Sequence, residues 1–181
     1  RLAAPRVEAS LRYSLDREPR VRVALFATDQ PETVEERHRA RDTIHVAGLL
    51  KEYLRRRYPN RVEDVRVYAI RDHSPVHYDE MFAFYQEELM RSALNPPDLT
   101  AAYVAPVGGI PAANFALLVQ AVDRYGERCH SLYVPEGSDE AVPMNLGQRM
   151  RTALLRRLAL EAVEALDFRR VAALLAEHPA P

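Results

Sequence analysis

The chain has 181 residues, of which 25 are basic and 26 are acidic, giving a net charge of −1. That balance lacks the basic surplus of a general nucleic-acid-binding protein, so we expect no general binding of DNA or RNA. Hydrophobic residues make up 48% of the chain and charged residues 28%, which excludes a disordered protein and predicts a globular one.

The sequence predicts neither a membrane segment nor a disulfide. No apolar run approaches the roughly 18 residues of a membrane-spanning helix. The single cysteine, Cys129, permits no intrachain disulfide, which is typical of proteins in a reducing compartment. We therefore expect a cytoplasmic protein.

The first part of the chain predicts an extension followed by a strand, a helix and a strand. Residues 1–20 are polar and contain two prolines, which predicts an irregular N-terminal extension. The apolar run 21–27 predicts a buried strand. Apolar residues recur at helical spacing in 42–54, which predicts an amphipathic helix. The run 65–70 predicts a second strand.

The next part continues this alternation after a loop at 71–78. The predicted segments are a helix at 79–94, a strand at 99–105, a helix at 111–125 and a strand at 129–134. Asp79 is the predicted cap of the first helix, and Pro111 is favoured at the first position of the second. Gly126 is the predicted end of that second helix.

Strands that alternate with helices predict a parallel sheet built from βαβ units. The expected fold class is α/β, Rossmann-like, with an open and mostly parallel sheet that has helices on both faces. We assign residues 21–143 to this ligand-binding domain, with 136–143 as a linker. Residues 144–181 are expected to be a helical linker or cap, with helices at 145–166 and 168–177, towards an effector domain outside this chain.

Three loops follow the carboxyl ends of the predicted strands, where open parallel sheets bind their ligands. The first is 28–30, the second is 72–75 and the third is 107–111. The third loop carries Gly108 and Gly109, which let the backbone approach a ligand closely. The helix that follows offers unpaired N–H groups suited to a phosphate, although a plain tight turn is the alternative.

The first loop places Thr28, Asp29 and Gln30 after the first strand, where their side chains can hydrogen-bond a base or a ribose. The alternative is that they only cap or solvate the loop. The third loop matches neither G-x-G-x-x-G nor Gly-Lys-Ser/Thr, so neither a dinucleotide fingerprint nor a P-loop is predicted.

The second loop, with Asp72, His73 and Ser74, does not predict a catalytic triad, because neighbouring residues rarely converge and no G-x-S-x-G elbow is present. His73 and His77 lack a third partner at metal-ligand spacing, so no metal is expected. His73 is a candidate ligand contact, with an ordinary polar loop as the alternative. Arg37, Arg39 and Arg41 form a basic cluster that either meets phosphates or is a solvated face.

Taken together, these loops resemble the CARF family, the CRISPR-associated Rossmann-fold sensor domains of type III CRISPR systems. The residues that carry the resemblance are 25–30 followed by 41–43, Pro75 with 78–85, and 108–114. Segment 159–168 is similar to the helical linker that follows the sensor in CARF–HEPN ribonucleases.

The resemblance implies a homodimer in which two copies bind one cyclic oligoadenylate, a ring of four or six AMP units. Binding would control an attached effector allosterically in type III CRISPR antiviral defence. No catalytic residue and no cofactor other than this ligand is implied. The ligand-binding residues implied are Thr28, Asp29, Gln30, Arg41, Thr43, His73, Ser74, Pro75, Val107, Gly108, Gly109, Ile110, Pro111 and Asn114.

The glycine turn departs from the pattern of many family members, which is Thr-Gly-Gly-Thr-Lys. This chain has Val107-Gly-Gly-Ile-Pro111, so the lysine and both hydroxyls are missing. We therefore expect binding of the ring rather than rapid cleavage. HEPN ribonucleases pair an Arg with a His at short spacing, and such pairs occur here no more often than chance gives.

Two other functions stay open. One is a nucleotide-processing Rossmann-like enzyme, such as a slow metal-independent ring nuclease, in which Thr28, Asp29 or His73 assists attack by a ribose hydroxyl. The other is a structural partner domain that binds no ligand.

Overall fold

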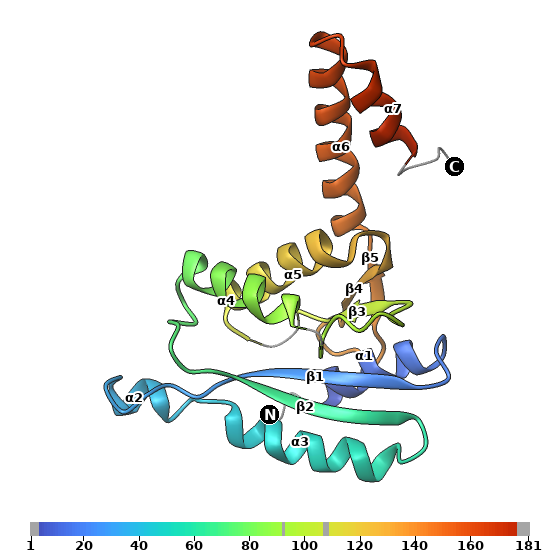
Figure 1. Ribbon diagram of the computed structural model, residues 1–181. Helices are drawn as coiled ribbons and strands as arrows, with labels where there is room; N and C mark the ends of the chain where they lie inside the picture. The colour runs from blue at the N-terminus through green and yellow to red at the C-terminus, as the bar shows by residue number, and fades with distance from the viewer. Residues whose placement is uncertain (1–3, 92, 107–108, 177–181) are drawn as a thin grey trace.

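Two apolar segments, β1 (Val21–Thr28) and β2 (Val62–Ile70), pair in parallel and bring Thr28 beside Ile70 at their carboxyl ends. The computed structural model describes residues 4–91, 93–106 and 109–176. Figure 1 shows β1 and β2 side by side with α3 (Ile44–Arg57) along them. Ala47, Leu50 and Leu54 form the buried face of α3, which confirms the amphipathic helix predicted there.

A second sheet holds the other strands. β3 (Ala102–Val104) pairs in parallel with β4 (Cys129–Tyr133), and β4 pairs antiparallel with β5 (Val142–Met144). The α/β class and the parallel pairing of strands with helical crossovers are as predicted. Among the described residues the strands form two sheets instead of one, because β1 pairs only with β2 and β3 pairs only with β4.

Helices α4 (Tyr78–Met90) and α5 (Pro111–Tyr125) lie next to each other on the side of β1 and β2 opposite to α3 (Figure 1). Pro111 begins α5, and Gly126, at φ 58°, follows its last residue, as predicted. The predicted cap of α4 was wrong, because the cap position is occupied by His77 and Asp79 lies in the first turn. Two short helices complete this part, α2 (Glu36–Arg39) and η1 (Gly126–Arg128).

The N-terminal segment, expected to be irregular, forms helix α1 (Ala4–Leu15). Val7, Leu11 and Leu15 recur every four residues, which is a helical spacing. The prediction gave more weight to the two prolines of the segment. Leu11 and Leu15 are buried in one cluster with Leu54 of α3 and residues of β2. Helix α1 is therefore part of the packed fold.

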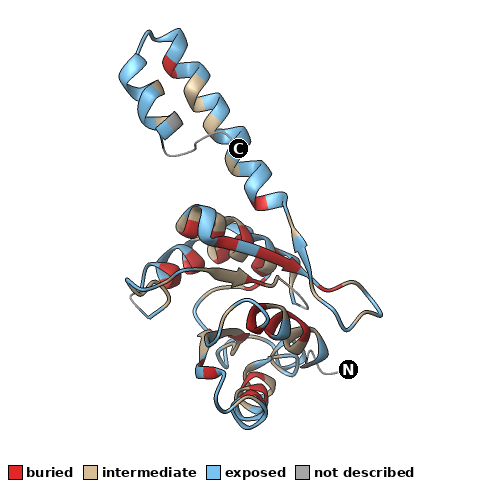
Figure 2. Cartoon of the chain, turned by 90° about the vertical axis from the view of Figure 1, so that its right-hand side faces the viewer, coloured by how far each residue is buried: buried red, intermediate tan, exposed pale blue. Residues whose placement is uncertain are grey.

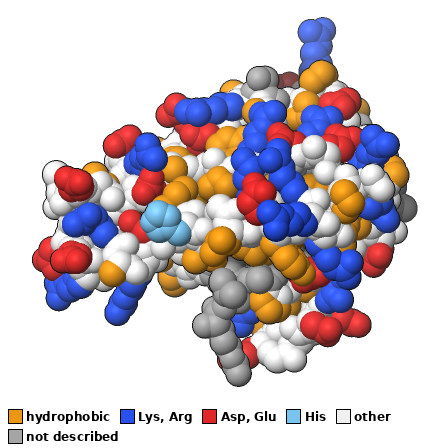
Figure 3. All heavy atoms as spheres, turned by 90° about the horizontal axis from the view of Figure 1, so that it is seen from below, with side chains coloured by type: hydrophobic (Ala, Val, Ile, Leu, Met, Phe, Trp, Pro, Cys, Tyr) orange, Lys and Arg blue, Asp and Glu red, His pale blue; other side chains and the backbone are white. Residues whose placement is uncertain are grey.

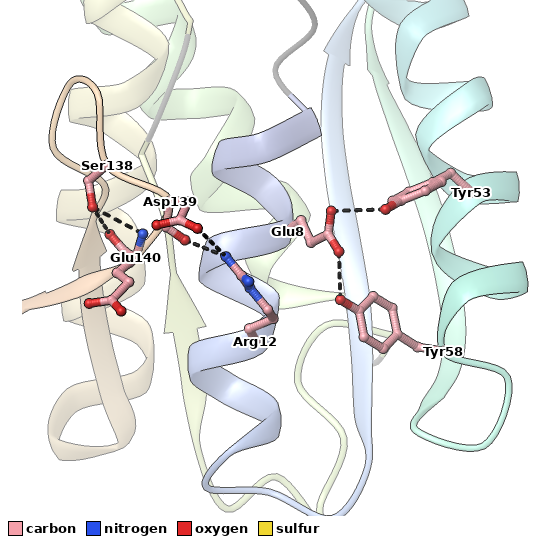
Figure 4. Close-up of polar contacts among 7 residues, drawn as sticks. All are labelled: Glu8, Arg12, Tyr53, Tyr58, Ser138, Asp139 and Glu140. Carbon is pink, nitrogen blue, oxygen red and sulfur yellow. Dashed lines mark hydrogen bonds and ion pairs between the residues drawn. The ribbon is translucent and has the colours of Figure 1, made fainter.

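Polar contacts on both sides of α1 fasten it to distant parts of the chain (Figure 4). The carboxylate of Glu8 accepts hydrogen bonds from Tyr53 Oη at 2.9 Å and from Tyr58 Oη at 2.8 Å. Burial acts to raise the pKa of Glu8, but the two tyrosine hydrogen bonds and the charges of Arg12 and Arg57 together outweigh it and lower that pKa. Arg12 contacts Asp139, which precedes β5. Helix α1 thus links α3 to the second sheet.

Phe26 of β1 packs against two buried clusters and joins the halves of the molecule. One cluster contains Ile70, Met81 and Phe84, and the other contains Val104 and Ala121 among others. The ring of Phe26 lies 5.0 Å from that of Tyr85 in an edge-to-face arrangement, which is favourable for buried aromatic rings. The sheets are therefore connected by side-chain packing under α4 and α5.

The C-terminal part is a hairpin of α6 (Leu146–Glu164) and α7 (Phe168–Ala176), close to the helices predicted there. It stands away from the sheets, and most of its surface is exposed (Figures 1 and 2). The linker expected before it contains strand β5, whose three residues are too few to show an alternating pattern. Within the described residues, no helix is long and apolar enough to cross a membrane.

Candidate functional site

A cavity of about 2060 Å³ separates the two sheets and is lined by residues of β1 and β3. The loops that follow β1, β2 and β3 all border its end at the carboxyl termini of these strands. We call this end the mouth and define it by the ten predicted site residues that line the cavity, Thr28, Gln30, Arg41, Thr43, His73, Ser74, Pro75, Gly109, Ile110 and Asn114. Segments that lie far apart in the sequence thus meet at one opening.

Two of the other four predicted residues are described, and these two do not line the cavity. Asp29 and Pro111 lie beside lining residues without contributing to the wall themselves. Val107 and Gly108 fall outside the described residues. The described part of the glycine turn therefore begins at Gly109.

The loop after β1 is fastened to the start of α3 by reciprocal hydrogen bonds between two threonines. Thr28 N donates to Thr43 Oγ1 at 3.0 Å, and Thr43 N donates to Thr28 Oγ1 at 3.1 Å. Both hydroxyls thus accept hydrogen bonds from the protein. Their sequence assignment as ligand contacts missed this structural role, because the partner lies 15 residues away along the chain.

Gln30 is held in a similar way by a single carboxylate. Gln30 N donates to Asp42 Oδ2 at 2.8 Å, and Gln30 Nε2 donates to Asp42 Oδ1 at 3.0 Å. The amide is fixed through its nitrogen, so its carbonyl oxygen is left to accept a hydrogen bond at the mouth. A fixed acceptor suits the exocyclic amino group of a base.

Arg71 and Asp29 form an ion pair across the ends of β2 and β1. Arg71 Nε lies 2.6 Å from Asp29 Oδ2, and Asp29 N donates to the carbonyl of Ile70 at 3.0 Å. Arg71 lines the cavity, although the sequence did not single it out. The sequence did contain a signal for Arg71, because this residue directly follows the predicted strand 65–70. Asp29 lies two residues after the end of the predicted strand 21–27.

The loop between β2 and α4 is organised by the carboxylate of Glu80. It accepts a hydrogen bond from Ser74 N at 2.5 Å and lies 3.0 Å from His77 Nδ1. The hydrogen bond from Ser74 N is the main cause that lowers the pKa of Glu80. The neighbouring ring of His73 lies 5.5 Å from that of Phe84. The loop thus has a defined shape at the mouth.

The loop before α5 brings backbone and side chain close together at Gly109. A Cβ atom at this position would lie 3.1 Å from Asn114 Oδ1, closer than side chains normally pack. Gly109 therefore allows Asn114 to lie against the turn. The first turn of α5 begins next to it at Pro111 and carries unpaired N–H groups of the kind that favour anions.

The walls of the mouth combine positive, polar and apolar groups. Arg41, Arg71, His38 and His73 line the cavity, and Pro75, Val76 and Ile110 add apolar surface. Such a mixture suits a ligand with phosphates and flat rings. The described residues contain no group of three or more His, Cys, Asp or Glu side chains placed to hold a metal ion.

Charges of both signs are mixed on the lower face of the molecule. On the face seen in Figure 3, blue Lys and Arg side chains are interspersed with red Asp and Glu side chains. A cation at the mouth therefore acts locally, and this face presents no extended basic surface.

No protein-family model and no curated protein matches the chain. Among solved structures it resembles Csm6 of Enterococcus italicus bound to cyclic hexa-2′-fluoro-hexa-dAMP, with a TM-score of 0.66 and 12% sequence identity. The match covers 88% of this chain and 43% of that chain, so this chain spans less than half the length of that protein. The likeness confirms the Rossmann-like α/β fold with C-terminal helices that the sequence predicted.

Proposed function

We propose that this chain is a sensor of cyclic oligoadenylate, a ring of four or six AMP units, in type III CRISPR antiviral defence. The observation that carries the proposal is the meeting of three strand-end loops at one mouth, in a chain with the fold of a ring-bound Csm6. The likeness to a ring-bound structure does not by itself define the function. The loops also present the groups that a polyanion with flat bases requires.

Each part of the mouth has a proposed contact with the ring. The Gly109 turn and the first N–H groups of α5 bind phosphate oxygens. The fixed carbonyl of Gln30 and the amide of Asn114 bind the edges of adenines. The apolar walls at Pro75 and Ile110 pack against the bases. Thr28 and Thr43 keep the first loop in place for these contacts.

We further propose that two copies share one ring. A cyclic oligomer with an even number of identical units has a two-fold axis, which suits a two-fold pair of protein chains. An exposed apolar patch beside the mouth supports this arrangement, because Tyr78 and Phe115 are 54% and 50% exposed and their rings lie 5.9 Å apart. Val76 extends the patch to the cavity.

The hairpin of α6 and α7 is the proposed route from ring binding to an effector. It leaves the second sheet after β5 and projects away from the mouth (Figure 1). Exposed Leu154, Leu160 and Phe168 give it apolar surface that an attached domain can cover. A ring that binds one dimer arrangement more tightly would shift the population towards it and move the hairpins.

The test is the melting temperature of the chain with cyclic tetra-adenylate, cyclic hexa-adenylate, linear hexa-adenylate or ATP. Binding to the folded state alone adds about 2.7 kcal/mol at a ligand concentration of 100 Kd, which raises the melting temperature by about 5–10 °C for a chain of this size. A rise with one ring only supports the sensor and gives the ring size. Equal melting temperatures in all samples would overturn the proposal and favour a ligand-free partner domain.

Product analysis of the same samples separates binding from cleavage. Since the glycine turn lacks the lysine of other family members, we expect the ring to be recovered intact. Conversion of the ring to linear oligoadenylate would instead favour the nucleotide-processing enzyme.

A further inference from the structure

The ring carries one negative charge per phosphate, whereas the protein has a net charge of −1 and no lysine in the glycine turn. Cations at the mouth must therefore come from other positions. Among the described lining residues near the mouth, the arginines are Arg41 and Arg71. Arg71 differs from Arg41 in being held by an ion pair.

The geometry of Arg71 leaves its outer nitrogens available. Its described contact is from Nε to Asp29 Oδ2 at 2.6 Å, and no hydrogen bond or ion pair from its two terminal nitrogens is found among the described residues. The side chain of Arg71 is 65% exposed and that of Asp29 is 28% exposed. Asp29 is itself anchored, since its N–H bonds the carbonyl of Ile70.

A guanidinium held at Nε presents its two terminal N–H₂ groups in a fixed plane. This fork matches two oxygens of a phosphate, and fixing it beforehand reduces the side-chain entropy lost on binding. Arg41 is exposed and has no described side-chain partner, so it would lose more freedom. Arg71 is therefore the better-placed phosphate contact.

We propose that Arg71 binds a phosphate of the cyclic ligand and that Asp29 is a positioning residue that orients its guanidinium. This inference rests on the proposed function and deepens it, because it assigns the phosphate contact to the end of β2 as well as to the glycine turn. Arg71 contacts the ligand, and Asp29 acts through Arg71.

Ring affinity of Arg71→Gln tests the first part, with Arg157→Gln as the matched control. Both variants lose one positive charge, but Arg157 lies on α6 and pairs with Glu161 at 2.9 Å, away from the mouth. Arg71→Gln removes one charge-assisted hydrogen bond from each of the two copies that share a ring, and each loss predicts an affinity about 10- to 100-fold weaker. Arg157→Gln should bind like the unchanged chain.

The salt dependence of binding gives a readout that a folding defect would not change in the same way. Because two copies share one ring, Arg71→Gln removes two phosphate contacts and lowers the slope of log affinity against log salt concentration by about two. Arg71→Lys, which keeps the charge but not the fork, should retain the slope and have intermediate affinity. Circular dichroism and melting without ligand check that each variant folds.

The role of Asp29 is tested by Asp29→Asn in the presence and absence of Arg71→Gln. If Asp29 orients Arg71, the substitution weakens binding in the unchanged chain and has no weakening effect in Arg71→Gln. The same loss in both backgrounds would overturn the positioning role.

The two proposals fail in different ways. Tight ring binding by the unchanged chain with equal affinity in Arg71→Gln and Arg157→Gln would overturn this inference and leave the sensor function standing. Absence of ring binding by the unchanged chain would overturn the sensor function and, with it, this inference.

Discussion

The carboxylate of Glu80 illustrates how one side chain shapes a ligand loop. It accepts a hydrogen bond from Ser74 N and also contacts His77 Nδ1. From its position in the first turn of α4, it therefore fixes the loop between β2 and α4. Because the hydrogen bond from Ser74 lowers the pKa of Glu80, this contribution is fully present above the ordinary glutamate pKa. It is lost as the pH falls through the lowered pKa of the folded state.

We predict that Glu80→Gln weakens ring binding several-fold at pH 7, because the neutral amide binds Ser74 N less strongly and loses the contact with His77. The measurement is ring affinity by titration calorimetry. Glu87→Gln is the control, since Glu87 lies on the same helix in an exposed pair with Arg91. Equal affinity of both variants would show that this loop does not contribute to binding.

The close approach of Gly109 to Asn114 leads to a second prediction. Gly109→Ala places a Cβ 3.1 Å from Asn114 Oδ1, so the amide must shift slightly, away from the position proposed for its contact with the ring. We expect weaker ring binding with a small change in melting temperature.

Gly48→Ala is the matched control for Gly109→Ala. Gly48 lies inside α3, and no atom outside the surrounding turns of its own helix lies within 4 Å of the position of a Cβ. The substitution should stabilise the chain by about 0.5–1 kcal/mol and leave ring affinity unchanged. If Gly109→Ala also binds normally, the turn does not approach the ligand as proposed.

At the level of single residues, the sequence predicted that the three loops meet, but it did not predict which partners each side chain has there. Position follows from the rule that strand ends converge, so the three loops were found. Roles depend on partners that are distant in sequence, such as Thr43 for Thr28 and Asp42 for Gln30. Arg71 was missed although it directly follows a predicted strand, because its pairing with Asp29 is formed only in the folded chain.

Among the elements, helix α1 has the clearest energetic consequence. Leu11 is 6% exposed and packs with Leu54 and Val65 under the sheet. We predict that Leu11→Ala lowers the free energy of unfolding by about 2–5 kcal/mol, measured by urea denaturation. Leu49→Ala, at an exposed position of α3, should change it by less than about 0.5 kcal/mol. Similar small effects for both would show that α1 is not packed on the sheet.

The lengths of the elements explain which of them the sequence could predict. α5 and α6 are long enough for several turns of apolar spacing and were predicted to within about two residues at each end. β3 was predicted at 99–105 but spans three residues, because an apolar run does not show where hydrogen bonding to a neighbour stops. β5 contains Pro143, which normally argues against a strand but is tolerated at an edge.

For the whole molecule, the exposed aromatic patch beside the mouth makes the oligomeric state testable. We predict a dimer for the unchanged chain and a monomer for Phe115→Asp, because a charge in an apolar contact between copies loses its hydration without gaining a partner. Light scattering after gel filtration measures this. Met90→Asp, at the other end of the neighbouring helix α4, should remain dimeric. A monomeric unchanged chain, with and without ring, would contradict the proposed pairing.

The overall organisation could be predicted because alternating strands and helices leave few ways to connect a parallel sheet. The division into two sheets could not be predicted, because no residue of β1 or β3 indicates that these two strands do not pair with each other. Side-chain contacts across this division, such as that of Arg22 with Asp98 at 2.8 Å, join segments 76 residues apart.

The separation of β1 from β3 gives the molecule a seam along its length. Backbone groups of β1 that point away from β2 have no strand partner among the described residues, and the halves are joined there by side chains such as Phe26. Two sheets that are joined only by side-chain packing can move relative to each other more easily than strands joined by backbone hydrogen bonds. A ligand at the mouth touches loops from both sides of the seam, so its binding acts on the relative position of two bodies. If the chain is the sensor proposed above, the two sheets would form the arms of a hinge with the ligand at its open end.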